Sequence, residues 1–286
     1  MPSKTRGADG TDWIERAPQS GGIERIEAFF HDAAYGLHRH DTYAIGRTLA
    51  GVQSFHYRRS VCNSVPGVTI VLHPDEAHDG QAGTEEGFRY RMAYVAPALF
   101  QQVLGGKPLP FIEGGLSDDP RLFAATEGLL QAIDRALDPL EQEDAIYELA
   151  MALDAASGAT HRTCIADYRA AERARQYLHE SLGRAVTLDE LAAASGKDKW
   201  SLSRDFRALF GTSPHRYLTM RRLDLVRQLA SQGRPLADAS AAAGFADQSH
   251  MTRHFTRAWG VPPSRWLKMV NQAGGAGFAA TALLRR

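Results

Sequence analysis

The segment "DKWSLSRDFRALFGTSP", residues 198–214, returns 49 positions later as "DQSHMTRHFTRAWGVPP", residues 247–263. Each copy opens on an aspartate, continues with apolar residues at helical spacing, and closes on a glycine followed by a proline. An aspartate caps a helix N-terminus, a glycine can end the helix in the left-handed conformation, and a proline stops it from continuing. The repeat therefore predicts two similar helices, each running from its aspartate to its glycine.

A shorter helix is expected before each copy. The first covers residues 188–195, with Thr187 and Glu190 as a capping box, and the second covers residues 236–243. A short helix, a tight turn and a second helix with a polar N-terminal face form a helix-turn-helix unit. Residues 214–231 read as a long helix joining the two units. The second helix of such a unit enters the major groove, so one chain would read two grooves about 34 Å apart.

The stretches "GTSPHRYLTMRRLDLVRQLA" and "GFADQSHMTRHFTRAWGVPPSRW" resemble the DNA-binding domain of the AraC/XylS family of bacterial transcription regulators. The resemblance covers about 100 residues. It departs from the family at Ala239-Ser240, where an Ile-Ala pair is usual. It implies that seven side chains face bases, three in the first reading helix and four in the second: Trp200, Ser203 and Arg204, then Gln248, Ser249, Thr252 and Arg253.

The chemistry of these side chains suits base recognition. Arg204 and Arg253 can each hold O6 and N7 of a guanine, and Gln248 can pair with N6 and N7 of an adenine. The two serines are short enough to reach only phosphate or water, so their role stays open. Nearby basic residues are candidates for phosphate contacts, which give affinity without sequence information: Lys197, Lys199, Arg207, Arg216 and Arg257.

Residues from about 22 to 112 alternate apolar and polar side chains in short runs, which predicts an antiparallel β-sandwich or small barrel. Within it, "GLHRHDTYAIGRTLAG" and "VPGVTIVLHPDEAHDG" resemble the two motifs of a cupin-type barrel, which in this family implies an effector-binding and dimerisation module. The expected effector-binding residues are His38, His40, Tyr43, His78 and Tyr90. Histidines and tyrosines suit a sugar or another small polar metabolite, and Phe55 and Tyr57 would suit an aromatic compound equally well.

His38, His40 and His78 match the histidines that ligate a metal in enzymatic cupins. The carboxylate that those enzymes carry four or five residues after the second histidine is missing, because Ala44 and Ile45 stand there. We therefore expect no metal and no cofactor. A purely structural role for the histidines at the barrel mouth remains the alternative to ligand binding.

Residues 119–157 change to helical spacing, and Asp138-Pro139 divides them into two helices. This helical hairpin is the candidate for dimerisation, and packing against its own barrel is the alternative. The expected organisation of the chain is a flexible arm at 1–21, a cupin-like domain at 22–157, a linker at 158–166, a DNA-binding domain at 167–271 and a flexible tail at 272–286. The fold class is thus α+β, with an antiparallel barrel followed by an all-α domain.

Charge, cysteine content and apolar runs limit the classes of protein to which the chain can belong. Residues 165–271 carry 17 Lys and Arg against 10 Asp and Glu, whereas the rest carries 16 against 23, so one half fits a polyanionic partner. Cys62 and Cys164 provide neither a disulfide framework nor a zinc spacing. The first 20 residues have no apolar core and no run of about 18 apolar residues occurs. We expect a cytoplasmic protein with no membrane partner.

Together these features predict a sequence-specific transcription regulator, an activator controlled by a small effector in the barrel. Its expected partners are double-stranded DNA, the effector, a second copy of the chain in a homodimer, and RNA polymerase. No residues form a defensible catalytic set, so no enzymatic activity is expected. The alternatives are a metal-dependent cupin enzyme fused to a DNA-binding domain, and a regulator whose barrel only dimerises.

Overall fold

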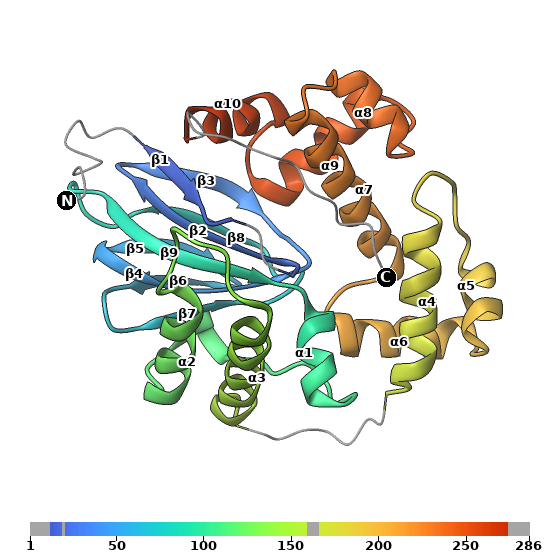
Figure 1. Ribbon diagram of the computed structural model, residues 1–286, viewed down its shortest axis with the longest axis horizontal. Helices are drawn as coiled ribbons and strands as arrows, with labels where there is room; N and C mark the ends of the chain where they lie inside the picture. Colours follow the sequence, from blue (N-terminus) through green and yellow to red (C-terminus); the bar gives the residue numbers. More distant parts are fainter. Residues whose placement is uncertain (1–11, 19–20, 159–165, 274–286) are drawn as a thin grey trace.

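The computed structural model describes residues 12–18, 21–158 and 166–273, which form a β domain followed by a helical domain (Figure 1). The β domain contains two antiparallel sheets. The larger sheet has the strand order β1-β2-β9-β4-β7-β10, and the smaller has the order β3-β8-β5-β6. The strands are β1 Trp13–Arg16, β2 Ile23–Phe30, β3 Ala33–His38, β4 Tyr43–Gly51, β5 Gln53–Tyr57, β6 Ser60–Ser64, β7 Thr69–Leu72, β8 His78–Ala82, β9 Phe88–Val95 and β10 Leu116–Ser117.

The alternation along β9 shows how the larger sheet is buried on both faces. Phe88, Tyr90 and Met92 join the core between the two sheets, whereas Ala93 and Val95 join a second core beneath the helices. Successive side chains of a strand point to opposite faces, so this sheet separates the two cores. A pocket between the sheets is therefore lined by every second residue of β9 and of β4, namely those whose side chains point toward the smaller sheet.

Three helices cover the outer face of the larger sheet: α1 Pro97–Leu104, α2 Pro120–Leu130 and α3 Pro139–Ala156 (Figure 1). The expected hairpin is present, but α2 ends at Leu130, and residues 131–138 connect it to α3. The apolar stripe of the hairpin, which includes Leu122, Leu149 and Leu153, packs on Ile45 and other residues of the sheet. That stripe therefore stabilises its own domain and is not free to bind a second copy.

The helical domain contains the remaining helices: α4 Tyr168–Glu180, α5 Leu188–Ser195, α6 Lys199–Phe210, α7 Pro214–Ser231, α8 Leu236–Ala242, α9 Gln248–Trp259 and α10 Pro263–Ala273. The α5–α6 and α8–α9 pairs are the two expected helix-turn-helix units, and α7 joins them. Asp198 and Asp247 accept hydrogen bonds from backbone N–H groups at the starts of α6 and α9. Gly211 and Gly260 end these helices in the left-handed conformation. The predicted α+β fold class and both repeated helices are confirmed.

Several short elements were not predicted, among them β10 at Leu116–Ser117. Residues 13–16 of the expected flexible arm form β1, which pairs with residues 26–29 of β2. Helix α1 lies within the segment that was expected to be all β. Residues 1–11, most of the expected linker and the tail beyond Ala273 lie outside the described residues, and α10 extends two residues into the expected tail.

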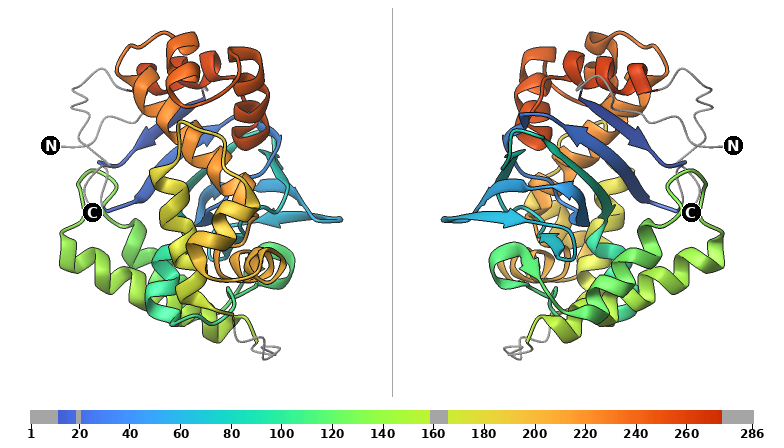
Figure 2. Two further views of the ribbon diagram at one scale, coloured as in Figure 1. Left: turned by 90° about the vertical axis from the view of Figure 1, so that its right-hand side faces the viewer. Right: turned by 90° about the vertical axis from the view of Figure 1, so that its left-hand side faces the viewer.

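The helical domain lies against one end and one edge of the β domain (Figures 1 and 2). Helix α6 contacts α1, whereas α9 and α10 contact β3 and β1. Each helix-turn-helix unit is thus held against a different part of the β domain. Within the described residues, no helix combines the length and apolarity needed to span a bilayer.

Candidate functional site

Helix α6 buries one face and presents the other to solvent. Leu202, Phe206 and Leu209 are buried in the core of the first unit, whereas Trp200 is 71% exposed. The Arg204 side chain is also largely exposed, and one of its nitrogens lies 3.2 Å from the Ser201 hydroxyl. The predicted contacts Ser203 and Arg207 are joined, because the Arg207 guanidinium donates to the Ser203 hydroxyl and to its carbonyl.

Helix α9 has the same construction. Met251, Phe255 and Ala258 are buried, and Thr252 is half-buried. The predicted contacts Gln248, Ser249, Arg253 and Arg257 are exposed. His250 and His254 lie on this helix with their Nε2 atoms 2.9 Å apart, and both rings pack near Phe245. These two histidines therefore contact each other and the core edge.

Two of the residues expected to contact phosphate form ion pairs within the protein. Lys197 forms an ion pair with the buried Asp205. Arg216 pairs with Asp75 of the β domain and donates to the Arg39 carbonyl at 2.8 Å. Both cations form ion pairs within the protein in this structure, and their contact with phosphate stays a prediction. Lys199 pairs with the exposed Asp189 at 3.0 Å and remains half-buried at the start of α6.

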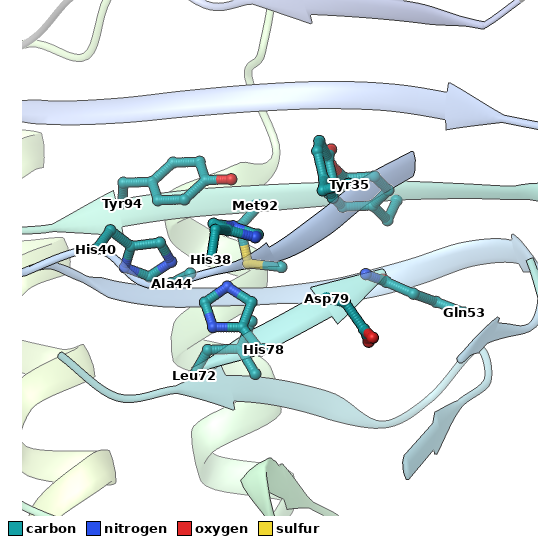
Figure 3. Close-up of a pocket in the computed structure, with 11 residues that line it drawn as sticks. Tyr35, His38, His40, Ala44, Gln53, Leu72, His78, Asp79, Met92 and Tyr94 are labelled. Atoms are coloured by element: carbon teal, nitrogen blue, oxygen red, sulfur yellow. The ribbon is translucent and has the colours of Figure 1, made fainter. Parts of the chain in front are cut away.

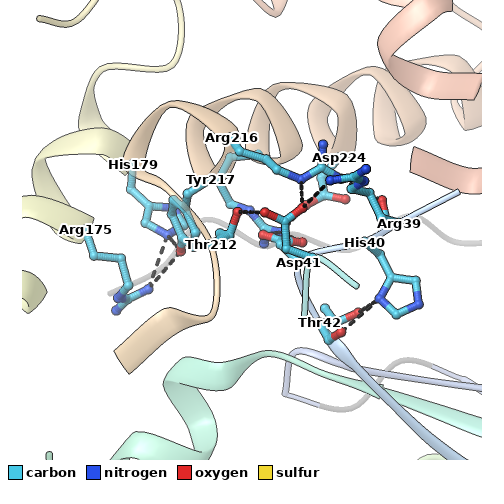
Figure 4. A network of polar contacts seen from close by, with 12 residues as sticks. Arg39, His40, Asp41, Thr42, Arg175, His179, Thr212, Arg216, Tyr217 and Asp224 are labelled. Carbon is cyan, nitrogen blue, oxygen red and sulfur yellow. Dashed lines mark hydrogen bonds and ion pairs between the residues drawn. The ribbon is translucent and has the colours of Figure 1, made fainter. Parts of the chain in front are cut away.

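A set of ion pairs joins α7 to the β domain. Arg221 donates to both oxygens of Asp41, at 3.0 and 2.9 Å. Asp41 lies beside Arg216 and Asp224 of α7 (Figure 4). Arg227 donates to Glu24 at 3.0 Å. Asp41 is only 3% exposed. Several cations counted toward a polyanionic partner therefore face acidic residues of the same chain. The charge asymmetry between the two halves reflects the contact between the domains as well as any external partner.

The β domain contains a small pocket between the two sheets, open to solvent (Figure 3). His38 and His78 face each other across β3 and β8, and His40 follows β3. The pocket is lined by Tyr35, His38, His40, Ala44, Gln53, Leu72, His78, Asp79, Tyr90, Met92 and Tyr94. Four of the five predicted effector residues thus share this pocket.

Tyr43 is the exception. Its ring lies in the core beneath the helices, against Phe100, and its hydroxyl donates to the Pro110 carbonyl at 2.7 Å. The period of two that groups His38 and His40 with Ala44 places Tyr43 on the opposite face. The assignment of Tyr43 to this pocket is therefore wrong.

Four further polar residues line the pocket and were not predicted: Tyr35, Gln53, Asp79 and Tyr94. Tyr94 could have been found, because it lies four residues after Tyr90 on the same strand and therefore on the same face. Gln53 and Asp79 come from the smaller sheet, and no motif marked them. The Asp79 carboxylate is turned toward His56, and it accepts from the His56 backbone N–H and lies 2.8 Å from its Nδ1.

The pocket contains three histidines whose neutral forms are favoured by burial and several polar atoms that the protein leaves unpaired. Burial lowers the pKa of His38 and His78, and burial together with the neighbouring His38 lowers the pKa of His40 to about 3. Among the described residues, four buried polar atoms of the lining have no hydrogen-bond partner: the hydroxyls of Tyr35 and Tyr90, Gln53 Oε1 and His40 Nε2. An unpaired buried polar group costs about 1–3 kcal/mol. These atoms are therefore positioned to bind a polar ligand.

Comparisons with known proteins agree with this architecture. Residues 20–150 match the model of the AraC-like ligand binding domain, and residues 191–269 match a helix-turn-helix domain model. The chain is 26% identical over 220 residues to the uncharacterized HTH-type transcriptional regulator YbfI of Bacillus subtilis, covering 75% of this chain and 80% of that protein. It is 27% identical over 103 residues to the multiple antibiotic resistance protein MarA of Escherichia coli, covering 36% of this chain and 80% of that protein.

A crystal structure of ToxT from Vibrio cholerae has a similar fold. It matches with a TM-score of 0.60 at 11% identity, covering 93% of this chain and 98% of ToxT. Another ToxT structure, described as bound to unsaturated fatty acid, matches with a TM-score of 0.59 at 11% identity, covering 90% of this chain and 94% of that one. The two family models cover both domains seen here, in the same order. The chain therefore belongs to the AraC family of DNA-binding transcription regulators, with an N-terminal ligand-binding domain and a C-terminal helix-turn-helix domain.

Proposed function

We propose that α6 and α9 read two successive major grooves through the exposed starts of the two helices. Trp200, Ser203 and Arg204 would contact the first set of bases. Gln248, Ser249, Thr252 and Arg253 would contact the second set. Lys199, Arg207 and Arg257 would hold the backbone. The observation that carries this proposal is the repeat itself, because each copy buries its apolar face and exposes an arginine at the same position.

Footprinting of genomic fragments with the full chain tests this assignment. Replacing a guanine-reading arginine is expected to cost about 1–3 kcal/mol of discrimination. Arg204→Ala should remove protection over one groove segment, and Arg253→Ala should remove it over the neighbouring segment. Lys199→Ala serves as the matched control, since loss of a phosphate contact weakens all sequences alike and lowers the salt slope by about one. Unchanged footprints in both arginine variants would reject the base contacts.

We further propose that the pocket around His38, His40, His78 and Tyr90 binds a small polar effector. The unpaired polar atoms of the lining support a ligand that supplies both hydrogen-bond donors and acceptors. Three histidines and three tyrosines line the pocket, so we infer a small polar ligand rather than a long acyl chain such as the fatty acid of the ToxT complex. Histidines and tyrosines at these positions suit a hydroxylated or carboxylated metabolite.

A panel of such metabolites can be screened by thermal shift and then by DNA affinity. A true effector should stabilise the wild type and change its affinity for DNA. Tyr90→Phe is the informative variant, because the hydroxyl that it removes has no partner in the described structure, so folding should be preserved. If a compound stabilises both Tyr90→Phe and Gln53→Leu as much as the wild type, the compound binds outside this pocket. A barrel that only dimerises would show no response to any compound.

The proposed homodimer would use the outer face of α3. Leu140, Tyr147 and Met151 are exposed there, on the side of the helix away from the sheet. A dimer would place up to four reading helices on paired half-sites, and contacts with RNA polymerase would make the protein an activator. Sedimentation of the Tyr147→Glu/Met151→Glu variant tests this face, since a dimer that persists unchanged would exclude it.

A further inference from the structure

Two histidines of α9 contact each other one helical turn apart. His250 and His254 are four residues apart on this helix, so their side chains lie on the same face. Their Nε2 atoms are 2.9 Å apart, and the planes of the two rings are inclined by 74°. Both side chains are half-buried, so the pair is packed against the helix and still reached by solvent.

The first helix-turn-helix unit has no such pair. The equivalent residues, 49 positions earlier in the repeat, are Ser201 and Asp205. Asp205 is buried there and forms an ion pair with Lys197. Helix α6 nevertheless has the same N-cap, the same glycine end and a similar buried face. The fold of the unit therefore does not require the histidine pair.

The contact between the two rings leaves at least one nitrogen as a bare acceptor. Only one hydrogen can lie between the two Nε2 atoms, because two N–H donors would repel each other. Nδ1 of His250 is buried and has no hydrogen-bond partner among the described residues. Burial and the neighbouring His250 lower the pKa of His254, which favours its neutral form. Neutral imidazole nitrogens are the commonest metal ligands in proteins.

The distance between the two nitrogens selects a class of ion. Bonds of about 2.0–2.1 Å place two ligand nitrogens about 2.9 Å apart at a right angle and about 3.4 Å apart in a tetrahedron. The observed 2.9 Å fits the right angle, which is typical of tetragonal Cu²⁺ and Ni²⁺ sites with nitrogen and oxygen ligands. We propose that His250 and His254 bind one such ion through their Nε2 atoms. Each ring then carries its hydrogen on Nδ1, and water oxygens complete the coordination.

The cations around the pair limit the affinity. After burial and His250, three further groups lower the pKa of His254, namely Arg257, His215 and Arg216, and cations there also oppose a metal ion. Arg216 is paired with Asp75, and Arg257 is exposed to solvent, which screens its charge. A metal ion is therefore tolerated beside them, and removal of the Arg257 charge should tighten its binding. The proposal concerns α9 alone and does not depend on the proposed DNA contacts.

Nickel binding by the full chain tests the proposal. Protein stripped with a chelator is titrated with Ni²⁺ by calorimetry, and hydrogen exchange along α9 is followed by mass spectrometry. In the wild type we expect Ni²⁺ to slow exchange in α9, because the ion joins two successive turns, and X-ray absorption to show two imidazoles at the ion. His254→Gln and His250→Ser should each weaken this binding at least about 10-fold, since loss of even an outer contact costs about 10–100-fold. His250→Ser carries the residue that the first unit has at this position, so folding should be preserved.

Three further variants separate this site from other histidines. His78→Gln alters the histidines of the β domain and should keep the Ni²⁺ effect on α9. His215→Gln should also keep it, and Arg257→Gln should strengthen it. Exchange in α9 that ignores Ni²⁺ in the wild type would overturn the proposal. So would a Ni²⁺ affinity that falls in His78→Gln and not in His254→Gln, which would place the ion in the β domain. A loss in His215→Gln as large as that in His254→Gln would contradict the two-histidine ligand set.

Discussion

Glu24 of β2 is an acidic residue whose pKa is strongly perturbed at the contact between the domains. It pairs with Arg16 at 2.9 Å and with Arg227 of α7 at 3.0 Å. Burial raises the pKa of this carboxyl, but the two arginines outweigh burial and hold the pKa at about 2. The carboxylate form is therefore favoured in the folded protein relative to the unfolded chain, whose glutamate has the ordinary value of 4.5.

The sign of the pH dependence follows from this lowered pKa. Stability from Glu24 is fully present above about pH 4.5 and is lost as the pH falls toward 2. The contribution is at most about 3 kcal/mol, since one pKa unit corresponds to about 1.4 kcal/mol. We expect the unfolding free energy of the wild type to fall over this range, and Glu24→Gln to lack that component. Acid titration followed by circular dichroism measures it, with the exposed Glu85→Gln as control. Parallel acid profiles for the wild type and Glu24→Gln would refute the assignment.

The two helix-turn-helix units were predictable because their signals are local. The caps Asp198 and Asp247, the end glycines and the apolar spacing all lie within each helix or beside it. Strand β1 and helix α1 were missed for the opposite reason. The four residues of β1 become a strand only through pairing with β2, and the neighbouring α10 lies far away in sequence. Short elements of this kind depend on partners that local patterns do not reveal.

The end of α9 is where the second unit meets the β domain. Gly260 has a φ of 68°, and a Cβ placed there would lie 2.6 Å from the Gly36 carbonyl oxygen of β3. The Arg39 N–H donates to the Arg257 carbonyl at 3.1 Å beside this contact. Gly260 therefore serves both the left-handed helix end and the close approach of α9 to β3.

Gly260→Ala should combine two costs, and Gly233→Ala isolates one of them. Gly233 also has a positive φ, of 85°, but a Cβ there meets nothing within 4 Å. Backbone strain of this kind costs about 1–3 kcal/mol. We expect Gly260→Ala to lower the unfolding free energy more than Gly233→Ala and to raise hydrogen exchange in β3, measured by mass spectrometry. Equal losses in the two variants, with β3 unchanged, would show that the approach to β3 contributes nothing.

The pocket and the contact between the domains differ in how far the sequence reveals them. His38, His40, His78 and Tyr90 were placed together by motif and strand parity, and the structure brings these four into one pocket. The ion pairs between α7 and the β domain join residues about 140–200 positions apart, and no periodicity marks them. These ion pairs also account for part of the positive charge of residues 165–271, since Arg216, Arg221 and Arg227 face acidic partners within the chain.

Residues 39–41, which directly follow His38 and include His40, connect the pocket to the helical domain. Arg39 lies between His38 and His40, and its carbonyl accepts from Arg216 while its N–H donates to the Arg257 carbonyl. Asp41 follows directly and receives Arg221. A ligand that moves these histidines would therefore act on the contacts that hold α7 and α9. The segment joins the proposed effector pocket to the two helices proposed to read DNA, and coupling between them would require a two-state change in these contacts.

Arg221 tests whether these contacts make the two domains unfold together. Removing one partner of a buried ion pair costs about 3–5 kcal/mol, because the other charge is left buried and unpaired. In Arg221→Leu, the buried Asp41 can regain water only if the helical domain separates from the β domain. We expect scanning calorimetry to show one transition for the wild type and two for Arg221→Leu, and scattering to show a larger radius of gyration. Arg234→Leu, which removes an exposed arginine beyond the end of α7, should behave as the wild type. A single unchanged transition in Arg221→Leu would mean that the remaining contacts, at α1, β1 and β3, hold the domains together without this pair.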